Sequence, residues 1–419
     1  MEMCQGPALW AYNDAVFTDE DLQNINKLAG GTKKEDTNKV GRFGLGFNSV
    51  YNLTDVPSLI TRNFFIMFDP HTTHIPNLIK CNSQPGIKLN LEKNPRVLRM
   101  YKDQFHVYNG IFGCDLNKQA SFNSTLFRFP LRRADAAKTS EISLKVYDQE
   151  QMEKLVNALE KQSLSLLLFT QHVKRVEVFQ LRPESQNVRD VDLLLTFTIE
   201  EGIDNKMNPA SSGFNSFDEC RQHLKRGTAY MKISSAFEND IPPLLHSPEL
   251  VSYTVKTTCN KDKQNEGKDE YDEQMWVISS CISDGEARTL ALKGEGKRSG
   301  LLPCGGVAVK LQAKGDLKYT LAETKGELFC FLPLNIQNNM PVHINGCFAV
   351  DSHRRSIRQH VDSDVEKPIE VRWNEVLMND VISRAYVHLL EILLQNDTLQ
   401  EKGVVYSLWP VATTKETLY

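Results

Sequence analysis

Apolar residues recur at two spacings along the first half of the chain. In PALWAYND, residues 7–14, apolar and polar residues alternate and aromatic residues are frequent, which is typical of a half-buried strand. Residues 148–169 instead carry apolar side chains at helical spacing from Met152 to Leu159, which predicts an amphipathic helix. The strands predicted in this half cover residues 7–14, 58–69, 124–132, 173–181 and 191–199. Pro130 marks the end or the edge of the third strand, and we expect a sheet faced by helices.

A local start signal predicts another helix in FTDEDLQNINKLAGG, at residues 17–31. Thr18 is a common N-cap residue, and Asp21 three positions later can return a hydrogen bond to the backbone of Thr18. Glycines at positions 30 and 31 give a stop signal. The chain order is therefore strand, helix, loop, and then a glycine-rich stretch before another helix.

The second half reads differently, because strand-like segments dominate it. Residues 202–217 are rich in Gly, Asn and Ser and predict a domain boundary. The charged run at 260–274 predicts a solvated loop, and residues 381–395 predict a helix near the end. The strands predicted here cover residues 251–258, 275–282, 306–312, 326–334 and 341–350. We expect an α+β protein with two domains, at residues 1–205 and 206–419.

Composition and charge narrow the class of protein. Of 419 residues, 41% are apolar and 24% charged, and no apolar run is long enough to cross a membrane. Nine cysteines are scattered singly without a CxxC pair, which is typical of reduced thiols in the cytoplasm. The formal net charge is −4, without a basic stripe. We expect a cytoplasmic protein that binds neither membrane nor nucleic acid.

The stretch GRFGLGF, residues 41–47, places three glycines among apolar side chains just before a helical pattern. Glycines at a helix start let backbone N–H groups approach an anion such as phosphate, and the helix dipole favours negative charge there. The alternative is a tight turn that buries Phe43, Leu45 and Phe47 in the core. The spacing matches neither a Walker loop nor a dinucleotide-binding fingerprint, so spacing alone leaves both interpretations open.

The longer segment VGRFGLGFNSVY resembles the second glycine box of the GHKL nucleotide-binding superfamily, which includes the heat-shock-protein-90 chaperone. In that box a GxFGxGF segment and the following helix close over the phosphates of ATP. Other segments, in the same order, are similar to repeat regions of the sacsin family. They are QGPALWAYNDAVFTDEDLQNI, FDPH at 68–71, GIFG at 110–113, STLFRFPLR and PVHINGCFAVDSHRRSI. The resemblance implies a GHKL-type α/β sandwich that binds nucleotide, followed by a second, middle-like α/β domain.

Several nucleotide contacts are implied by this resemblance. The glycine box would contribute Gly41, Arg42, Phe43, Gly44, Leu45, Gly46 and Phe47. Lys33, or Lys34 beside it, could meet a phosphate from a lid at residues 29–40, although this KKED cluster also fits a solvated surface. Thr125 matches the threonine that holds adenine through water, and its alternative is an ordinary β-branched strand residue.

At the adenine-binding aspartate the sequence departs from the family pattern. Alignment on TDEDL places Tyr12 at that position, followed by Asn13, and by Asp14 where the family has glycine. Asn13 could accept the hydrogen bond of adenine through its amide oxygen, and Asp14 could reach it after a small backbone shift. Either residue could instead cap the turn before Thr18.

Two arginines of the second domain match a sacsin motif, Arg354 and Arg355 in DSHRRSI. By looser analogy they could contact the γ-phosphate of ATP, because a planar guanidinium pairs with phosphate oxygens. The alternative is a structural ion pair or a solvated pair. His343 and His353 have no acid and nucleophile at useful spacing, so we interpret both as structural.

The family helix that carries a water-activating glutamate and a magnesium-binding asparagine would precede the strand at 7–14, and the sequence does not contain it. ATP and Mg²⁺ are the implied cofactors. We therefore expect them to bind weakly or not at all, and hydrolysis to be inefficient.

Two functions remain open. The first is a sacsin-like chaperone or co-chaperone module that assists protein folding or quality control, with client proteins, other chaperones or other repeats of a larger chain as partners. The second is a nucleotide-independent scaffold or client-binding module with a degenerate ATP site. A DNA-acting GHKL ATPase is a third class, which the weakly acidic charge disfavours.

Overall fold

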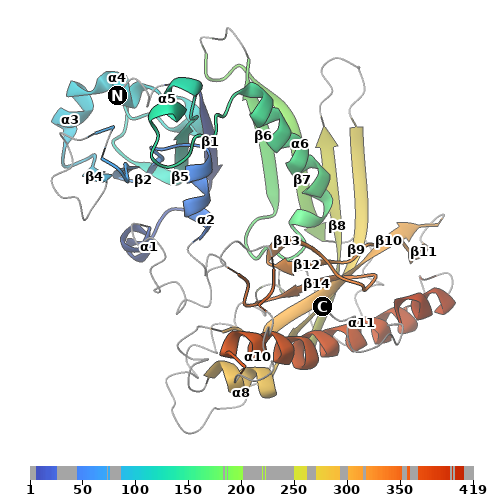
Figure 1. Cartoon of the computed structure of the whole chain (residues 1–419). Helices are drawn as coiled ribbons and strands as arrows, with labels where there is room; N and C mark the ends of the chain where they lie inside the picture. The colour runs from blue at the N-terminus through green and yellow to red at the C-terminus, as the bar shows by residue number, and fades with distance from the viewer. Residues whose placement is uncertain are drawn as a thin grey trace. The chain divides into compact units, whose positions relative to one another are not determined.

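The protein has an α+β fold with two sheets, as the computed structural model shows (Figure 1). The structure describes residues 6–25, 45–72, 74–75, 86–182, 185, 187–201, 219, 222, 250–261, 270–292, 301–314, 318–351, 356–358, 367–396, 399 and 402–409. These residues form two compact units. The first contains residues up to Ala158 together with Phe179–Asp192, and the second contains Leu159–Val178 and the residues from Leu193 onward. The predicted boundary at 202–217 lies outside the described residues, so the domains 1–205 and 206–419 stay a prediction.

The first unit is built on an antiparallel five-stranded sheet. In sheet order its strands are β1 (Ala8–Asn13), β5 (Phe122–Pro130), β2 (Ser58–Arg62), β3 (Phe64–Phe68) and β4 (Gly86–Asn90). The predicted strand at 58–69 is therefore a hairpin of two strands, and Arg62 takes the positive φ of 52° at its turn. Pro130 ends β5, as predicted, because it has no N–H to donate to a ladder.

Helices cover both faces of this sheet. On one face Leu59 and Ile66 pack with residues of α1 (Asp19–Asn24), α2 (Leu45–Asn48) and the 3₁₀ helix Ser49–Asn52. On the other face the alternate residues Ile60 and Phe65 pack against α3 (Pro95–Met100), α4 (Lys102–His106) and the segment that follows them. Period-two alternation of apolar residues that are buried on both faces makes the sheet the middle layer of this unit. A further helix, α5 (Ala134–Thr139), follows β5.

The capping signal before α1 is confirmed. Thr18 Oγ1 accepts a hydrogen bond of 3.1 Å from the Asp21 N–H, and Asp21 Oδ2 accepts one of 3.0 Å from the Thr18 N–H. This reciprocal pair satisfies two of the backbone donors that a helix N-terminus leaves open. The predicted stop at Gly30 and Gly31 lies outside the described residues.

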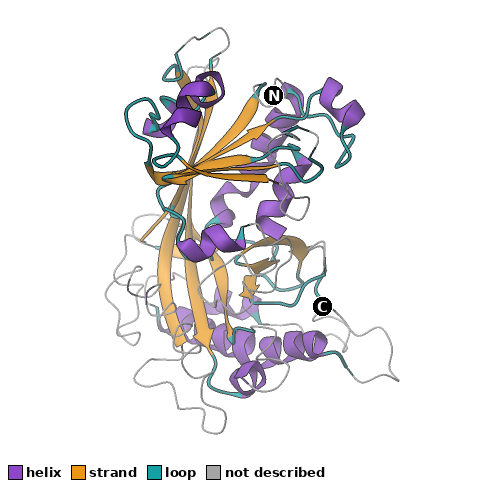
Figure 2. Cartoon of the chain, turned by 90° about the vertical axis from the view of Figure 1, so that its left-hand side faces the viewer, coloured by secondary structure: helices purple, strands orange, loops and turns teal. Residues whose placement is uncertain are grey.

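The larger sheet has nine strands, whose long members run side by side in Figure 2. In sheet order they are β13 (Leu332–Gln337), β12 (Glu327–Cys330), β14 (His343–Gly346), β10 (Cys304–Ala313), β9 (Glu270–Ile282), β8 (Leu250–Lys261), β7 (Val191–Glu201) and β6 (Arg175–Leu181), with β11 (Tyr319–Leu321) paired to β10. The predicted strand at 326–334 is two strands, β12 and β13, with Phe331 at a φ of 62° between them. One face packs against the end of α6 (Gln149–Leu166) through a core that includes Leu168, Phe197 and Trp276.

Two expectations about these strands were wrong. We expected the strands at 173–181 and 191–199 to belong to the sheet of the first half, but β7 pairs with β8 along Leu195–Glu201. The charged run at 260–274 is also not wholly a loop, because β8 continues to Lys261 and β9 begins at Glu270. Lys261 and Glu270 are register partners within the charged run, and Lys256 Nζ lies diagonally 3.6 Å from Glu273 Oε2, so the charged residues suit a solvated strand pair.

The other face of the larger sheet is covered by a continuous C-terminal helix, longer than the predicted 381–395. It consists of α10 (Ile369–Val376), a π-helical segment at Leu377–Ile382 and α11 (Ser383–Gln395), and α11 lies against β8, β9 and β10. Glycines let the π-helical segment approach the strands closely. A Cβ on Gly305 would lie 2.6 Å from Ile382 Cδ1, and one on Gly346 would lie 2.9 Å from Leu377 Cδ2. Asp380 of this segment accepts a 2.8 Å hydrogen bond from the Ala287 N–H in α8 (Glu286–Leu292).

Candidate functional site

The helix that follows the glycine stretch is present in the first unit. α2 continues directly into the 3₁₀ helix at Ser49–Asn52. Phe47 packs toward the sheet, with its ring centroid 5.0 Å from that of Phe68 and 6.4 Å from that of Tyr51. Phe47 thus contributes to the core of this unit and anchors the helix on the sheet.

Gly46 is exposed, and its surroundings do not explain why it is glycine. A Cβ built on it meets no heavy atom of the described residues within 4 Å, and its φ lies outside the left-handed region. Its carbonyl oxygen accepts a 2.7 Å hydrogen bond from Ser49 Oγ. A glycine in a helix costs roughly 0.5–1 kcal/mol relative to alanine. Close approach of a ligand to the backbone is one of the situations that favour glycine.

A buried arginine fixes the C-terminal end of this helix. Arg132 follows β5, its side chain is 1% exposed, and it donates hydrogen bonds to Tyr51 O at 2.7 Å and Asn52 O at 2.9 Å. Its Nε and Nη2 lie 2.7 and 2.5 Å from Asp55 Oδ1. The last carbonyls of a helix lack partners within the helix, and a guanidinium has enough donors to satisfy two of them and a carboxylate together.

Arg132 also connects the helix to the segment that leads into α6. Its Nη1 donates a long hydrogen bond of 3.4 Å to Lys145 O, and its carbonyl oxygen accepts a 2.8 Å hydrogen bond from the Tyr147 N–H. We call α2 and the 3₁₀ helix that continues it, residues 45–52, the glycine-box helix. A displacement of this helix would therefore also disturb residues 145–147.

At the predicted adenine end, Asn13 of β1 and Thr125 of β5 are register partners. The Asn13 amide oxygen accepts a 3.2 Å hydrogen bond from the Ala15 N–H, which is the turn-capping contact. Asp14 is exposed directly after β1, and its carboxylate makes no hydrogen bond or ion pair with the described residues. Of the two candidate acceptors, only Asp14 has an uncommitted side chain.

Thr125 is fully buried within a chain of hydrogen bonds. Its hydroxyl donates to Ala15 O at 2.7 Å and lies 3.0 Å from Thr61 Oγ1, which in turn accepts a 3.1 Å bond from the Phe17 N–H. Because Thr125 uses its proton on Ala15, Thr61 is the donor between the two hydroxyls. The network ties the turn after β1 to the sheet.

Tyr12 is the residue that the resemblance aligns with the adenine-binding aspartate. Its ring stacks on Phe112 with centroids 4.8 Å apart and an interplanar angle of 13°, and its hydroxyl lies 3.3 Å from Ser124 Oγ. Phe112 adopts the uncommon φ of 45° within the GIFG motif. A phenol cannot replace a buried carboxylate as a strong acceptor, so the adenine amino group would need another partner here.

Most of the predicted phosphate contacts lie outside the described residues. They are Lys33, Gly41, Arg42, Phe43, Gly44, Arg354 and Arg355, and the side chain of Leu45 is not described either. Their roles stay predictions, as does the lid at residues 29–40. Among the described residues, no group of three His, Cys, Asp or Glu side chains is placed to hold a metal ion.

The described residues differ at the two ends of the predicted ATP site. At one end, a Cβ built on Gly46 meets no heavy atom of the described residues within 4 Å. At the other end the hydroxyl proton of Thr125 and the amide oxygen of Asn13 are engaged within the protein, which does not suit adenine bound as in the family.

Sequence reasoning did not single out Arg132, Asp55 or Thr61, which position the site. A signal for Arg132 was present, because it directly follows the apolar strand STLFRFPL. Its partner, however, lies 77 residues away in the chain, and spacing along the sequence does not reveal such a pair.

Tyr51 belongs to the 3₁₀ helix Ser49–Asn52 and interacts electrostatically with Asp69. The pKa of Tyr51 is raised to about 12, first by burial and then by the Asp69 charge. Asp69 Oδ2 accepts hydrogen bonds from the backbone N–H groups of His74 and Ile75, at 2.9 and 2.8 Å. Tyr51 is therefore a neutral, half-buried phenol at neutral pH and has no role as a base.

His343 has the structural role that we expected. It is buried against Trp276 and Phe329, and its Nδ1 accepts a 3.1 Å hydrogen bond from the Glu327 N–H. Burial, and secondarily the Lys310 charge, lowers its pKa to about 4. We also predicted a structural role for His353, which lies outside the described residues.

None of the helices in the described ranges is long and apolar enough to span a membrane.

Comparison with known proteins identifies relatives of this chain. Residues 1–192 match the family model described as the Sacsin domain. Human sacsin is 34% identical to the chain over 450 aligned residues, which cover 98% of this chain and 10% of sacsin. The chain thus spans about a tenth of the length of that relative. On these two matches, the chain belongs to the sacsin family and corresponds to a sacsin repeat region.

Proposed function

We propose that the chain is a sacsin-type chaperone or co-chaperone module whose first unit binds ATP along the glycine box of a GHKL fold. The observation that carries the proposal is Gly46, an exposed glycine on which a built Cβ meets no heavy atom of the described residues within 4 Å. Support also comes from the anchored helix, which Phe47 holds on the sheet and Arg132 holds at its C-terminal end. Such a helix can present backbone N–H groups to phosphate without further ordering.

The proposed effect of ATP is to order the lid at residues 29–40 and to shift the glycine-box helix. Through Arg132 the shift would reach residues 145–147, directly before α6. Proposed partners are client proteins, other chaperones and other repeats of a larger chain. The last of these is supported by the small share of human sacsin that this chain covers. The proposed location is the cytoplasm, supported by described cysteines that form no disulfide.

A second candidate is a client-binding scaffold that does not use nucleotide. The engaged Thr125 and Asn13 favour it, as does the tyrosine at position 12. In this case the GHKL-type unit would hold partner chains on its surface, and the glycine box would be a remnant of an ATP site.

Titration calorimetry with Mg-ATP separates the two candidates. The wild-type chain should bind ATP, and Gly46→Leu should weaken binding at least about tenfold, because its side chain would occupy the space beside the backbone. Gly403→Leu is the matched control, since a Cβ at Gly403 also meets no described atom within 4 Å but lies in the second unit.

A second measurement addresses the chaperone role. Suppression of aggregation of a model client by the wild-type chain, with a response to ATP that Gly46→Leu abolishes, would support the first candidate. Equal suppression with and without ATP, together with no heat of ATP binding, would support the scaffold. Failure to hold any client would contradict both candidates.

A further inference from the structure

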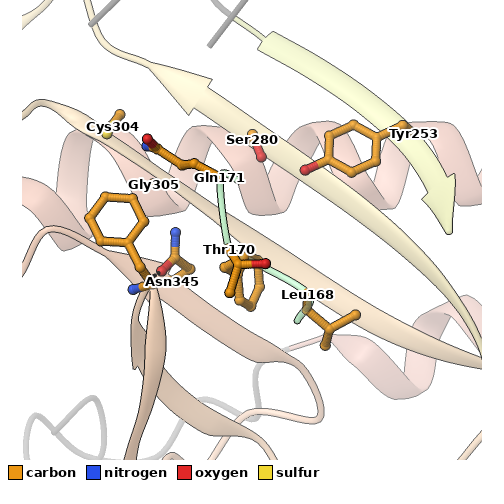
Figure 3. Close-up of a pocket in the computed structure, with 10 residues that line it drawn as sticks. Leu168, Thr170, Gln171, Tyr253, Ser280, Cys304, Gly305 and Asn345 are labelled. Carbon is orange, nitrogen blue, oxygen red and sulfur yellow. Dashed lines mark hydrogen bonds between the residues drawn. The ribbon is translucent and has the colours of Figure 1, made fainter. Parts of the chain in front are cut away.

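The molecule has two features that the proposed function does not use. One is a pocket in the second unit, lined by residues without a formal charge at neutral pH, among them Thr170, Gln171 and Tyr253 (Figure 3). An uncharged lining of mixed polarity suits many small molecules alike. The other feature is a charged surface of the first unit, which selects its partner more sharply.

The charged surface lies on α3 and at the start of α4 (Figure 1). We call it the basic surface, and it consists of Lys93, Arg96, Arg99, Met100 and Lys102. All five side chains are exposed, and Met100 is 73% exposed. Arginine and methionine are enriched where proteins bind one another, so this combination is typical of an interaction surface.

The four cations of the basic surface form no ion pair with the residues that the structure describes. The two acids of the same stretch bind neutral amides instead. Glu92 Oε2 accepts a 2.9 Å hydrogen bond from Asn63 Nδ2, and Asp103 Oδ2 accepts one of 2.7 Å from Gln104 Nε2. Four cations and two acids give residues 92–106 a formal charge of +2. The side chains of the cations are therefore available to a partner.

Helical spacing gathers three members of the basic surface on one side of α3. Arg99 and Met100 follow Arg96 by three and four residues, and residues so spaced are neighbours on a helix. Two like charges at this spacing repel each other and weaken the helix. The pair of arginines therefore suits a binding role better than a role in helix stability.

The opposite side of these helices is anchored in the core. Val97, Leu98 and Tyr101 pack against the core of the first unit, and Phe105 of α4 is buried in it. Pro95 in the first turn of α3 fixes the backbone there. The basic surface is thus ordered before a partner arrives, which lowers the entropy cost of binding.

We propose that the basic surface binds an acidic polypeptide segment. Carboxylates of the segment pair with Arg96, Arg99 and Lys102, because a guanidinium can hold a carboxylate through two parallel hydrogen bonds. An apolar side chain of the segment packs on Met100. The six residues of α3 are about 9 Å long, and an extended chain advances about 3.3 Å per residue, so about five residues cover α3 and the start of α4.

The charge of the whole chain favours a short acidic segment over a larger polyanion. The formal net charge is −4, so the positive charge of the basic surface is local. Charges are screened beyond about 8 Å at physiological ionic strength, so a segment lying on the basic surface meets mainly its cations. A membrane or a nucleic acid extends past the surface and meets the acidic remainder of the chain as well. The basic surface shares no residue with the predicted ATP site, so the proposal does not depend on nucleotide binding.

The test is fluorescence anisotropy with the full chain and a short fluorescein-labelled peptide of glutamates with one central leucine. The wild-type chain should bind this peptide, and a rise from about 50 to about 500 mM NaCl should weaken binding at least about tenfold, because salt screens the ion pairs. Arg99→Glu should weaken binding at least about tenfold, since the new carboxylate repels the peptide. Met100→Ala should weaken it about threefold through the lost apolar contact.

Arg133→Glu is the matched control, because it makes the same change in net charge at an exposed arginine of the first unit that already pairs with Asp135, at 3.1 Å. It should change the affinity less than about twofold. Equal losses in Arg99→Glu and Arg133→Glu, with both proteins folded by circular dichroism, would overturn the assignment of the site. Absence of peptide binding by the wild type would overturn the proposal, as would tighter binding of phosphatidylserine vesicles or duplex DNA that Arg99→Glu abolishes.

Discussion

Two buried ionisable side chains, Arg132 in the first unit and His343 in the second, are accommodated in opposite ways. In the first, Arg132 and Asp55 are taken out of water as a charged pair, and the guanidinium also satisfies two helix carbonyls. In the second, His343 is buried as a neutral ring between aromatic side chains. The comparison teaches that the first unit depends on an intact pair, whereas the second depends on His343 staying unprotonated.

The largest effect is expected from breaking the charged pair. Arg132→Met should lower the free energy of unfolding of the first unit by about 3–5 kcal/mol, because it leaves the buried Asp55 carboxylate without its counter-charge. The exposed neighbouring pair of Arg133 and Asp135 gives a matched control, and Arg133→Met should cost no more than about 1 kcal/mol. Urea unfolding of both variants provides the measurement, and equal losses would mean that the buried pair does not hold the unit.

Acid should affect the second unit through His343. Its folded pKa, about 4, lies below the ordinary 6.5, so the unfolded chain binds more protons between these values. The contribution of about 3 kcal/mol is complete above pH 6.5 and is lost as the pH falls toward 4. His343→Gln should flatten this part of the stability profile. Burial raises the pKa of Glu327, so its effect is to lower the stability of the folded state as the pH rises. Both proteins carry Glu327, so the difference between their stabilities at each pH is due to His343. A variant with an unchanged slope between pH 4 and 6.5 would contradict the neutral-histidine interpretation.

Thr125 tests the adenine end of the first unit. Thr125→Val should cost about 1–2 kcal/mol, because Ala15 O loses its donor and the Thr61 hydroxyl loses its acceptor. ATP binding, measured by calorimetry, should change little, since the hydroxyl has no proton to spare for a nucleotide-bound water. Ser124→Ala, which removes only a half-buried contact with Tyr12, is the control. A large loss of ATP affinity without loss of stability would show that Thr125 does contact the nucleotide.

The smallest effect on stability is expected at Gly46. Gly46→Ala should leave the free energy of unfolding unchanged or raise it by up to about 1 kcal/mol, because the added methyl group meets no described atom and alanine favours helix. Thermal unfolding measures this effect. A clear destabilisation would mean that packing, not a ligand, requires the glycine.

Local signals predicted the elements well, and long-range pairing limited the rest. Thr18 and Asp21 predicted the start of α1, because a capping box is complete within four residues. The alternating apolar residues of β1 and β5 predicted strands, because this pattern is also complete within a few residues. That β7 joins β8 depends on pairing across residues 202–249, which no local pattern encodes.

For the candidate site, the helix after the glycine box was predicted from sequence and is present, because its apolar pattern is local. The nucleotide contacts of the glycine box stay a prediction. The engagement of Thr125 by Thr61 and Ala15 could not be predicted, because three segments distant in sequence meet there. The π-helical segment before α11 was missed for a related reason, since its close approach depends on Gly305 and Gly346 of other strands.

The order in which the two sheets close during synthesis follows from their strand pairing. The five-stranded sheet is complete once Pro130 has left the ribosome, whereas β10 and β12 wait for β14, which ends at Gly346. At roughly 5–20 residues per second, translation of the intervening stretch takes on the order of ten seconds or more. β10 is complete at Ala313, so for the last few seconds of that interval the nascent chain exposes the unpaired edge of β10, a strand rich in apolar residues and open to misassembly.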